Sequence, residues 1–365
     1  MQFLTPTLTV NVSAIVANWQ TLRAQFSGRE TAAVVKADAY GLGMVEVAIA
    51  LEKAGCHTFC VATLGEGISL RAALPDVRIL VFHGVQEGEE FAFRQHRLVP
   101  ALASRVQVER WKPVAVEFPH AVSALHVDTA MARLGLQMDE FTAWLAAEPE
   151  LLKQCRVGLV MSHLACAPEP AHPSNAQQRD AMQQLRALVG EDMPMSLCNS
   201  GGIYLPRDFH FDLARPGCAL YGIAPQDGGT NPMQQVAQWD APIISTRVLE
   251  RAQAVGYGAT QTLPKGARMA TVATGYADGY LRHASGRGAV GYVGEYRAPL
   301  VGRVTMDMLC FDVSGVPEAL LGDGAMLTLL GDRDGIRVDD VAAAADTIGY
   351  EVLTRIGPRV RRIYI

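Results

Sequence analysis

The stretch VVKADAYGLG occupies residues 34–43 and guides the interpretation of the whole chain. Two β-branched residues predict the end of a strand and deliver Lys36 to that end. A loop of small residues with two glycines follows. A lysine in this position can be half buried and kept reactive, as in lysines that form imines with aldehydes. The motif by itself favours the simpler alternative, a strand-end lysine that extends into water, so the rest of the sequence must decide.

The composition is that of a globular protein long enough for more than one domain. The chain has 365 residues, of which 49% are hydrophobic and 19% charged, and this excludes an intrinsically disordered chain. The net charge is −5 and the sequence pI about 6.0. No basic run or stripe occurs, so nucleic acid is not expected as a partner.

The sequence also predicts a cytoplasmic protein with no membrane partner. Residues 1–6 lack the charged-then-apolar layout of a signal peptide, and no apolar run approaches the ~20 residues of a membrane span. Seven cysteines are scattered without a C-x-x-C pair, and most lie among apolar residues. This pattern favours reduced, buried thiols over disulfides or zinc ligands, and no metal site is predicted.

Between residue 31 and about residue 222, short apolar runs alternate with helix-period segments. The runs begin near Ala33, Thr58, Arg78, Leu98, Val122, Val157, Met195 and Asp212. Strands that alternate with helices predict parallel pairing. Eight such units predict a closed (β/α)8 TIM barrel, and an open doubly wound sheet is the alternative.

Three predicted helices, two of them in this region, have readable boundaries. One runs from Met44 to Gly55, where the glycine is a stop signal. Another runs from Asn175 to Val189, with Ser174 or Asn175 as its N-cap, and a third begins at a cap formed by Ser13.

After Gly222 the character of the sequence changes. Residues 225–232, PQDGGTNP, look like a linker. The β-rich segments beyond it are 243–249, 268–274, 290–293, 299–306, 308–313 and 326–330. They predict an all-β domain with one helix at 339–348. Residues 7–12 alternate like a strand that joins this domain.

The predicted fold class is therefore α/β, an N-terminal (β/α)8 TIM barrel followed by a C-terminal all-β domain. We place the barrel at residues 1–225 and the β domain at residues 226–365.

Catalytic groups of such a barrel gather at the carboxyl ends of its strands. The polar residues that follow predicted strands here are Lys36 after the first, Arg133 after the fifth, His163 after the sixth, Asn199 to Gly202 after the seventh, and Arg215 to Gly217 after the eighth. Loops after strands seven and eight commonly bind phosphate, because glycines let backbone amides approach an anion. An imine-forming lysine with a phosphate site points to pyridoxal 5'-phosphate (PLP). The simpler alternative for the glycine-rich loop is a plain turn.

The sequence resembles the alanine racemase family over essentially its whole length. The segments that carry the resemblance are residues 33–43, 128–135, 162–165, 199–200, 215–217, 256–260, 275–280 and 302–308. The resemblance implies a fold type III PLP enzyme, an isomerase that interconverts L- and D-alanine and supplies D-alanine for peptidoglycan or for alanine catabolism. It also implies homodimers with shared active sites.

The resemblance implies a two-base mechanism. Lys36 would hold PLP and then act as the base on the D-face of the substrate, and Tyr257 of the other protomer would serve the L-face. Racemisation removes a proton from one face of a carbon and returns one to the other, so two bases must flank it. Both groups have ordinary pKa values of about 10. The lysine needs burial or neighbouring cations to lower its pKa, and the tyrosine needs neighbouring cations that stabilise its phenolate.

The other implied roles concern binding. Arg133, Met306 and Asp307 would contact the substrate, the last two from the partner. The remaining cofactor ligands would be Tyr40, His163, Asn199, Ser200, Arg215, Gly217 and Cys218. Arg215 would face the pyridine nitrogen, to which a guanidinium can only donate.

The sequence departs from the family pattern in two places. Many members have a lysine, often carbamylated, where this chain has His126. The sequence therefore does not identify the group that holds Arg133 in place. Pro358 stands where some members place a tyrosine at the substrate entrance. A racemase of broader specificity is the nearest alternative function. A PLP-dependent decarboxylase fits less well because of the Tyr257 segment and the modest size of the chain. A non-enzymatic PLP carrier fits less well because such carriers lack the domain that contains Tyr257 and Met306.

Overall fold

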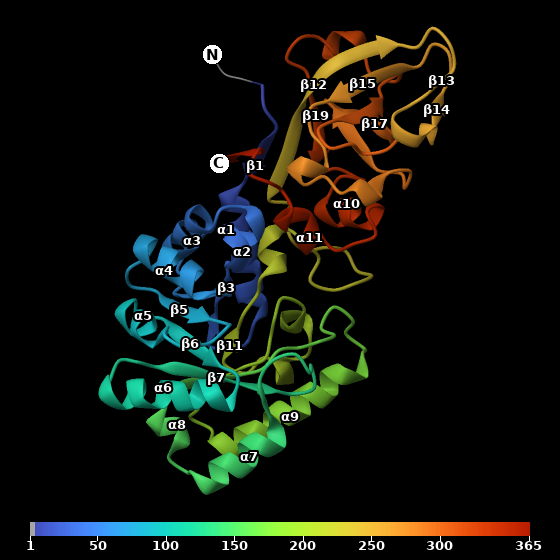
Figure 1. Ribbon diagram of the computed structural model, residues 1–365. Coiled ribbons are helices and arrows are strands. Elements are labelled where there is room, and N and C mark those ends of the chain that lie inside the picture. Colours follow the sequence, from blue (N-terminus) through green and yellow to red (C-terminus); the bar gives the residue numbers. More distant parts are fainter. Residues whose placement is uncertain (1–3) are drawn as a thin grey trace.

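The computed structural model describes residues 4–365, and its first part is a barrel of short parallel strands (Figure 1). The strands are β2 (Glu30–Thr31), β3 (Ala33–Val34), β4 (Thr58–Val61), β5 (Arg78–Val81), β6 (Val99–Leu102), β7 (Ser123–Asp128), β9 (Val157–Met161), β10 (Met195–Ser196) and β11 (Leu213–Ala214). Hydrogen bonds join them in the order β3-β4-β5-β6-β7-β9-β10, and β8 (Leu136–Gln137) pairs with β7. Apart from the short strands β2 and β8, the strands bury most of their side chains, as parallel strands covered by helices do.

Strand β11 closes this sheet into a barrel. It pairs in parallel with β2, and the Ala32 amide donates to the Ala214 carbonyl at 2.9 Å. On its other side, the Asp212 amide donates to the Met195 carbonyl at 2.9 Å. The strands lie where the apolar runs predicted them, and the closed barrel is confirmed over the open sheet.

Helices cover the outside of the barrel (Figure 1). They are α1 (Val12–Gln25), α3 (Met44–Lys53), α4 (Leu64–Ala73), α5 (Glu90–Gln95), α6 (Arg105–Glu117), α7 (Met138–Ala147), α8 (Leu151–Gln154) and α9 (Pro173–Val189), with the 3-10 turns η1 (Gly201–Tyr204), η2 (Arg207–Phe209) and η3 (Cys218–Tyr221). The predicted N-caps of two helices are wrong. Helix α1 is capped by Asn11 instead of Ser13, and α9 by His172 instead of Ser174 or Asn175. A proline occupies the first position of α9, where its missing N–H is tolerated, so this helix begins earlier than its polar residues suggest.

The second part of the chain is a β domain (Figure 1). Its strands are β12 (Ala237–Val248), β13 (Gln253–Ala254), β14 (Thr262–Leu263), β15 (Arg268–Val272), β16 (Val290–Val293), β17 (Tyr296–Val301), β18 (Leu309–Asp312), β19 (Met326–Leu330) and β20 (Arg361–Tyr364), with η4 (Tyr257–Ala259), η5 (Tyr276–Asp278), η6 (Arg282–Ala284) and η7 (Glu318–Leu320) between them. The first half of β12 pairs with β19 and its second half with β15. Strand order β15-β18-β17-β16-β19-β12 thus returns to its start. The long strand β12 therefore joins both ends of this strand order.

Both chain ends are tied to β12. Strand β1 (Thr7–Val10) pairs antiparallel with β12 and parallel with β20. The segment nearest the start of the described chain therefore belongs to the sheet of the β domain, although α1, which follows it, packs on the barrel.

The prediction of a single late helix at 339–348 is wrong in its end and in its number, because a shorter helix lies there and a second one follows it. They are α10 (Val338–Ala344) and α11 (Gly349–Thr354), separated by a turn in which Asp346 has φ 55°. Helix α11 reaches back to the barrel and brings two side chains to the cavity described below.

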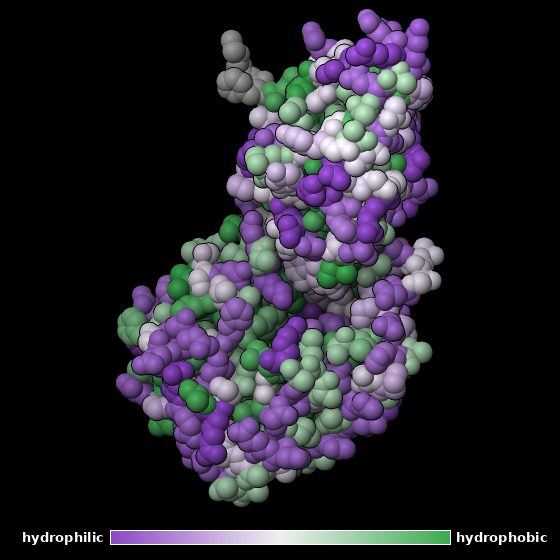
Figure 2. All heavy atoms as spheres, turned by 45° about the vertical axis from the view of Figure 1, so that its right-hand side comes forward, coloured by the Kyte–Doolittle hydropathy of each residue, from purple (hydrophilic) through white to green (hydrophobic). Residues whose placement is uncertain are grey.

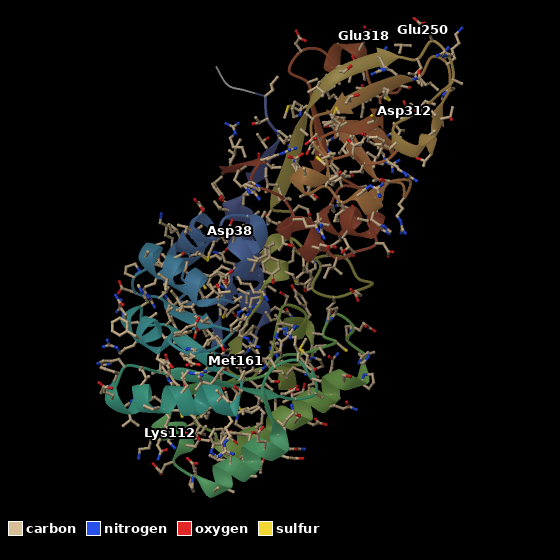
Figure 3. The ribbon with its side chains drawn as sticks, viewed as in Figure 1. Asp38, Lys112, Met161, Glu250, Asp312 and Glu318 are labelled. Atoms are coloured by element: carbon tan, nitrogen blue, oxygen red, sulfur yellow. The ribbon has the colours of Figure 1, made fainter. Side chains whose placement is uncertain are left out.

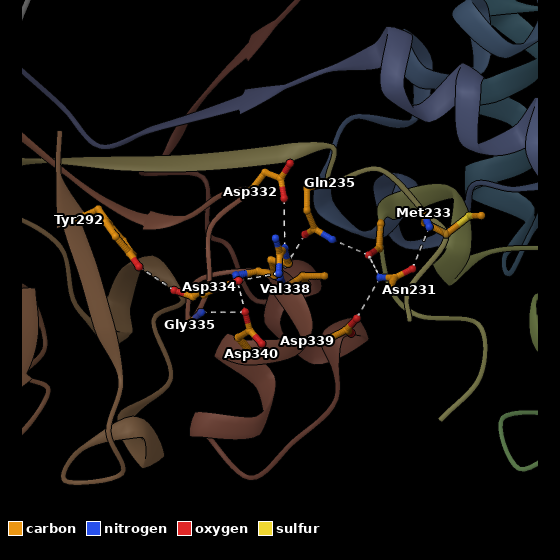
Figure 4. A network of polar contacts seen from close by, with 12 residues as sticks. Asn231, Met233, Gln235, Tyr292, Asp332, Asp334, Gly335, Val338, Asp339 and Asp340 are labelled. Atoms are coloured by element: carbon orange, nitrogen blue, oxygen red, sulfur yellow. Dashed lines mark hydrogen bonds and ion pairs between the residues drawn. The ribbon is translucent and has the colours of Figure 1, made fainter. Parts of the chain in front are cut away.

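A polar network joins the segment after the barrel to α10 (Figure 4). The Asp339 carboxylate accepts from the Ala224 amide at 3.0 Å and from Asn231 Nδ2 at 3.3 Å. Gln235 bridges the same parts, since it donates to the Gly222 carbonyl at 2.9 Å and accepts from the start of α10. These bonds satisfy backbone groups of a loop that has no sheet to pair with.

Buried apolar side chains from both parts form one continuous core. Its largest fully buried members include Trp19, Trp111, Tyr221 and Phe59. A smaller cluster lies beneath the β13–β14 hairpin. Within residues 4–365, no helix is both long enough and apolar enough to cross a bilayer.

Asp339 makes a prediction about stability. Burial raises the pKa of this carboxyl. A raised pKa means that the folded state favours the protonated form, so its contribution to stability is lost as pH rises through the folded-state pKa. Asp339→Asn keeps an oxygen acceptor without the charge. The free energy of unfolding of this variant, relative to that of the native protein, should therefore increase as pH rises from 4 to 7. Asp339→Ala leaves the donors unpaired and should cost about 1–3 kcal/mol. Urea titrations at several pH values measure both, and a pH-independent difference between Asn and Asp would contradict the assignment.

Candidate active site

A cavity of about 730 Å³ lies at the carboxyl ends of the barrel strands, beneath α11 of the β domain. Figure 2 shows the surface hollowed between the two parts of the molecule. The sequence-predicted residues that line the cavity are Lys36, Tyr40, Arg133, His163, Asn199, Ser200, Arg215, Gly217 and Cys218. Strand ends far apart in the sequence therefore meet in one site. Among the described residues that line it there is no aspartate or glutamate, so the site is electropositive.

Lys36 begins an unusual turn, α2 (Lys36–Gly41). The residues from Ala37 to Tyr40 all have φ between 52° and 58°, so four consecutive non-glycine residues have a left-handed backbone conformation. This conformation costs about 1–2 kcal/mol per residue, and backbone strain of this kind concentrates at functional sites. Figure 3 labels Asp38 in this turn, on the side of the barrel that faces the β domain. The Asp38 side chain accepts from the Met44 amide at 2.7 Å and so links the turn to α3.

Lys36 is half buried, and its surroundings favour the neutral amine. Burial, followed by the positive charge of Arg133, lowers the pKa of Lys36, while Glu66 and Cys60 oppose the shift. Lys36 Nζ lies 5.9 Å from the centroid of the Phe82 ring. A partly neutral amine in a cavity is a competent nucleophile and base, which a lysine extended into water is not.

The loop that carries Arg133 is held by the end of β7. The Asp128 carboxylate accepts from the Met131 amide at 2.8 Å and the Ala132 amide at 2.9 Å. Burial, followed by the charge of Arg215, lowers the pKa of His126 to about 4, so this histidine is neutral and supplies no counter-charge. Among residues 4–365, Arg133 forms no ion pair with an acid.

Arg215 is only 2% exposed, and two of its three guanidinium nitrogens donate to other residues. One terminal nitrogen donates to Ser196 Oγ, and the other donates to the Ser162 carbonyl at 2.5 Å. Its Nε has no partner among the described residues. Burial and the charges of Arg215 and Arg133 lower the pKa of the neighbouring His163 well below its usual range. A buried donor without a partner is costly, and it marks the place of an acceptor from a ligand.

The opposite end of the cavity has the small residues that an anion needs. Ser200 Oγ accepts from the Gly217 amide at 3.0 Å, which joins the loops after β10 and β11. A β-carbon at Gly217 would lie 2.5 Å from the Tyr40 hydroxyl, so only glycine fits beside it. Backbone amides, a serine and a buried tyrosine hydroxyl make a suitable phosphate cradle.

Sequence reasoning missed Tyr350 at this end. It comes from α11, lines the cavity and donates from its hydroxyl to Cys218 Sγ at 2.9 Å. Its ring lies beside that of Tyr40 in a tilted arrangement, with the ring centroids 5.8 Å apart. The sequence-based prediction placed the end of its only late helix at residue 348, two residues before Tyr350, and so did not place this tyrosine on a helix.

Three predicted residues do not line this cavity. Tyr257 is 73% exposed on η4, between β13 and β14, and Figure 1 places these strands at the end of the β domain away from the barrel. Met306 is 53% exposed, and the Asp307 carboxylate pairs with Arg359 at 2.9 Å. Within one chain, then, Tyr257 and Lys36 belong to different regions of the molecule.

Comparison with known proteins agrees with this geometry. The family model described as alanine racemase, N-terminal domain, matches residues 10–225, and that of the C-terminal domain matches residues 236–364. The chain belongs to the alanine racemase family. The alanine racemase of Rhodospirillum rubrum is 47% identical over 363 residues, which cover 99% of this chain and 96% of that protein.

Solved structures of the family have the same fold. The alanine racemase of Bartonella henselae, with covalently bound pyridoxal phosphate, superposes with a TM-score of 0.91 at 34% identity over 99% of both chains. The biosynthetic alanine racemase of Pseudomonas aeruginosa does so with a TM-score of 0.89 at 36% identity over 100% of both. The predicted combination of barrel and β domain is thereby confirmed.

The electrostatics of Lys36 can be tested without substrate. Competitive labelling of the cofactor-free protein across pH should give Lys36 a pKa below the usual value of about 10.4. Arg133→Gln removes a nearby positive charge and should raise that pKa. Lys53, at the exposed end of α3, serves as an internal reference whose labelling should not respond to the substitution. An unchanged Lys36 titration in the variant would show that Arg133 does not act on the amine.

Proposed function

We propose that this protein is a PLP-dependent racemase that interconverts L- and D-alanine by a two-base mechanism. The observation that carries the proposal is the half-buried Lys36 amine in an electropositive cavity that also contains a buried, unpartnered Arg215 nitrogen and a glycine-lined cradle. Membership of the alanine racemase family supports the same conclusion.

The side chains present fit PLP. Lys36 would hold its aldehyde carbon, and Arg215 Nε would donate to its ring nitrogen. The phosphate would be bound by Tyr40, Ser200, Gly217 and the Cys218 amide, with His163 and Asn199 beside the cofactor. Tyr350 extends this set. When bound, PLP withdraws electrons from the substrate Cα and makes its proton removable.

The protein's own part is to move protons and to orient the substrate. Lys36, whose pKa is lowered by burial and Arg133, takes or returns a proton on one face. Tyr257 does the same on the other face. Arg133 is the cation available for the alanine carboxylate, since no acid among residues 4–365 pairs with it. Because a guanidinium can only donate, Arg215 would leave the ring nitrogen of bound PLP unprotonated.

Tyr257 would enter the cavity of a second protomer, with Met306 and Asp307 lining the substrate pocket. Its 73% exposure on a turn far from its own barrel supports this arrangement. The same domain exposes further apolar side chains, Ile244 at 56%, Val248 at 57% and Met308 at 45%. Such side chains suit an interface between copies of the chain. These two features support a homodimer with shared sites.

The cytoplasm is the proposed location, and the product D-alanine would serve peptidoglycan synthesis or alanine catabolism. All seven cysteines are free, and five are buried, which suits a reducing compartment.

The activity is tested directly. Protein supplied with PLP should convert L-alanine to the racemate, and borohydride reduction should leave the cofactor on the peptide that contains Lys36. Lys36→Ala should lose about 10²–10⁴-fold or more in kcat, as expected for removal of a general base. Serine is expected to react more slowly, and equal rates for serine and bulkier amino acids would favour the broader-specificity racemase. No interconversion of alanine enantiomers with PLP present would sink the proposal.

The shared site makes a separate prediction. Lys36→Ala and Tyr257→Phe proteins should each be nearly inactive, but a mixture after subunit exchange should recover about one quarter of native activity, because half of the dimers then contain one intact site. Each variant incubated alone is the control. If native mass spectrometry demonstrates heterodimers and the mixture stays inactive, Tyr257 does not act across the interface.

A further inference from the structure

The left-handed turn that carries Lys36 has a capping problem. Any helical turn leaves amides unpaired at its start and carbonyls unpaired at its end. Ordinary helices solve this with side chains of neighbouring residues. Here the turn is short and strained, so its end groups need partners from other elements.

The amino end of the turn is capped by Glu66, from the first turn of α4. Its Oε1 accepts from the Ala37 amide at 2.7 Å. Its Oε2 accepts from the Ala62 amide at 2.7 Å and the Thr63 amide at 3.0 Å, the second of which completes a capping box with Thr63. A capping box alone needs only one carboxylate oxygen. The other oxygen joins the ends of β3 and β4 at the residue next to the lysine.

The carboxyl end is capped by Arg362, from β20 of the β domain. Its Nε and Nη2 donate to the Gly41 carbonyl at 3.2 and 3.1 Å. Its remaining bonds go to the carbonyls of Ile356, Gly357 and Val360. All of these hydrogen bonds go to backbone carbonyl oxygens, so the guanidinium links the turn to the segment after α11. At Gly41 a β-carbon would lie 2.8 Å from the Leu353 carbonyl, which shows how closely α11 packs on the turn.

We propose that Glu66 and Arg362 are positioning residues that hold the left-handed turn from both ends and so keep Lys36 and Tyr40 in the cavity. The inference deepens the proposed function and rests on it for its catalytic meaning. Neither residue lines the cavity. The two caps come from the barrel and the β domain, so the reactive lysine loop is held by both parts of the same chain.

The structure offers matched controls for each cap. Glu89 also accepts a backbone amide, that of Gln86, at 2.9 Å, but it lies at the start of α5. Arg71 spends its donors on the carbonyls of His96, Leu74, Pro75 and Arg97, as Arg362 does on others. Neither control residue contacts the turn. Glu66→Gln, Arg362→Lys, Glu89→Gln and Arg71→Lys therefore make two matched pairs.

The test measures hydrogen exchange of residues 36–41 in the cofactor-free proteins. Loss of one charge-assisted hydrogen bond should speed exchange there about tenfold in Glu66→Gln and in Arg362→Lys, and leave the controls at the native rate. PLP retention on dialysis should weaken in the same two variants. Amides of β5 and β6 report whether each variant has folded. Unchanged exchange of the turn in either cap variant overturns the inference for that residue, whatever happens to activity.

A double variant tests whether strain is what the caps oppose. Glycine adopts positive φ freely, so Ala37→Gly relieves strain in the turn. The loss of PLP retention caused by Glu66→Gln should therefore be smaller in the Ala37→Gly background than in the native one. Ala143→Gly, at an exposed position inside right-handed helix α7, should not reduce that loss. Equal losses in all backgrounds would show that Glu66 does not act through the turn. These measurements use no substrate, so failure of racemisation in the native protein would be a distinct result.

Discussion

Three cations, Lys36, Arg133 and Arg215, face one cavity whose described lining contains no carboxylate, and this imbalance governs the rest of the site. Burial, followed by the charges of Arg215 and Arg133, lowers the pKa of both His126 and His163 and keeps them neutral. Burial and the charge of Arg133 likewise favour the neutral form of the lysine amine. Anionic ligands restore the balance, and both a phosphate and an amino-acid carboxylate are of that kind. The cavity is thus chemically complete only when such groups enter it.

The left-handed turn shows how the fold tolerates a costly conformation at that site. Four consecutive residues outside the usual backbone regions cost several kcal/mol together, about 1–2 kcal/mol each. Such a turn persists only where surrounding contacts determine it, and here the barrel and the β domain both supply them. The result directs Lys36 and Tyr40 to the same cavity although they are only four residues apart. A right-handed turn followed by a flexible loop would leave the amine free to reach water, which is the simpler alternative that the sequence motif first suggests.

Much of this architecture can be predicted from the sequence, because buried strands consist of runs of apolar residues. The strands from Ala33 to Asp212 were predictable in this way, and the site followed from the polar residues at their ends. Features that depend on tertiary contacts could not be predicted from the sequence. The handedness of the turn after Lys36, the second function of Glu66, and the arrival of Tyr350 through α11 all require knowing which elements meet. The roles of Tyr257 and Met306 came from family resemblance alone, since an exposed side chain leaves no periodic signal.

The separation of Lys36 from Tyr257 has a physical logic. Two bases must lie on opposite faces of one carbon, yet a barrel presents side chains to its cavity from one side only. A second base has to arrive from above, on a separate element that is held firmly in place. The β domain of the same chain already covers its own barrel with α11, and its turn with Tyr257 points elsewhere. In the proposed homodimer, a second copy of the chain would meet the requirement without any new element, because symmetry would supply each cavity with the tyrosine that its own chain holds out of reach.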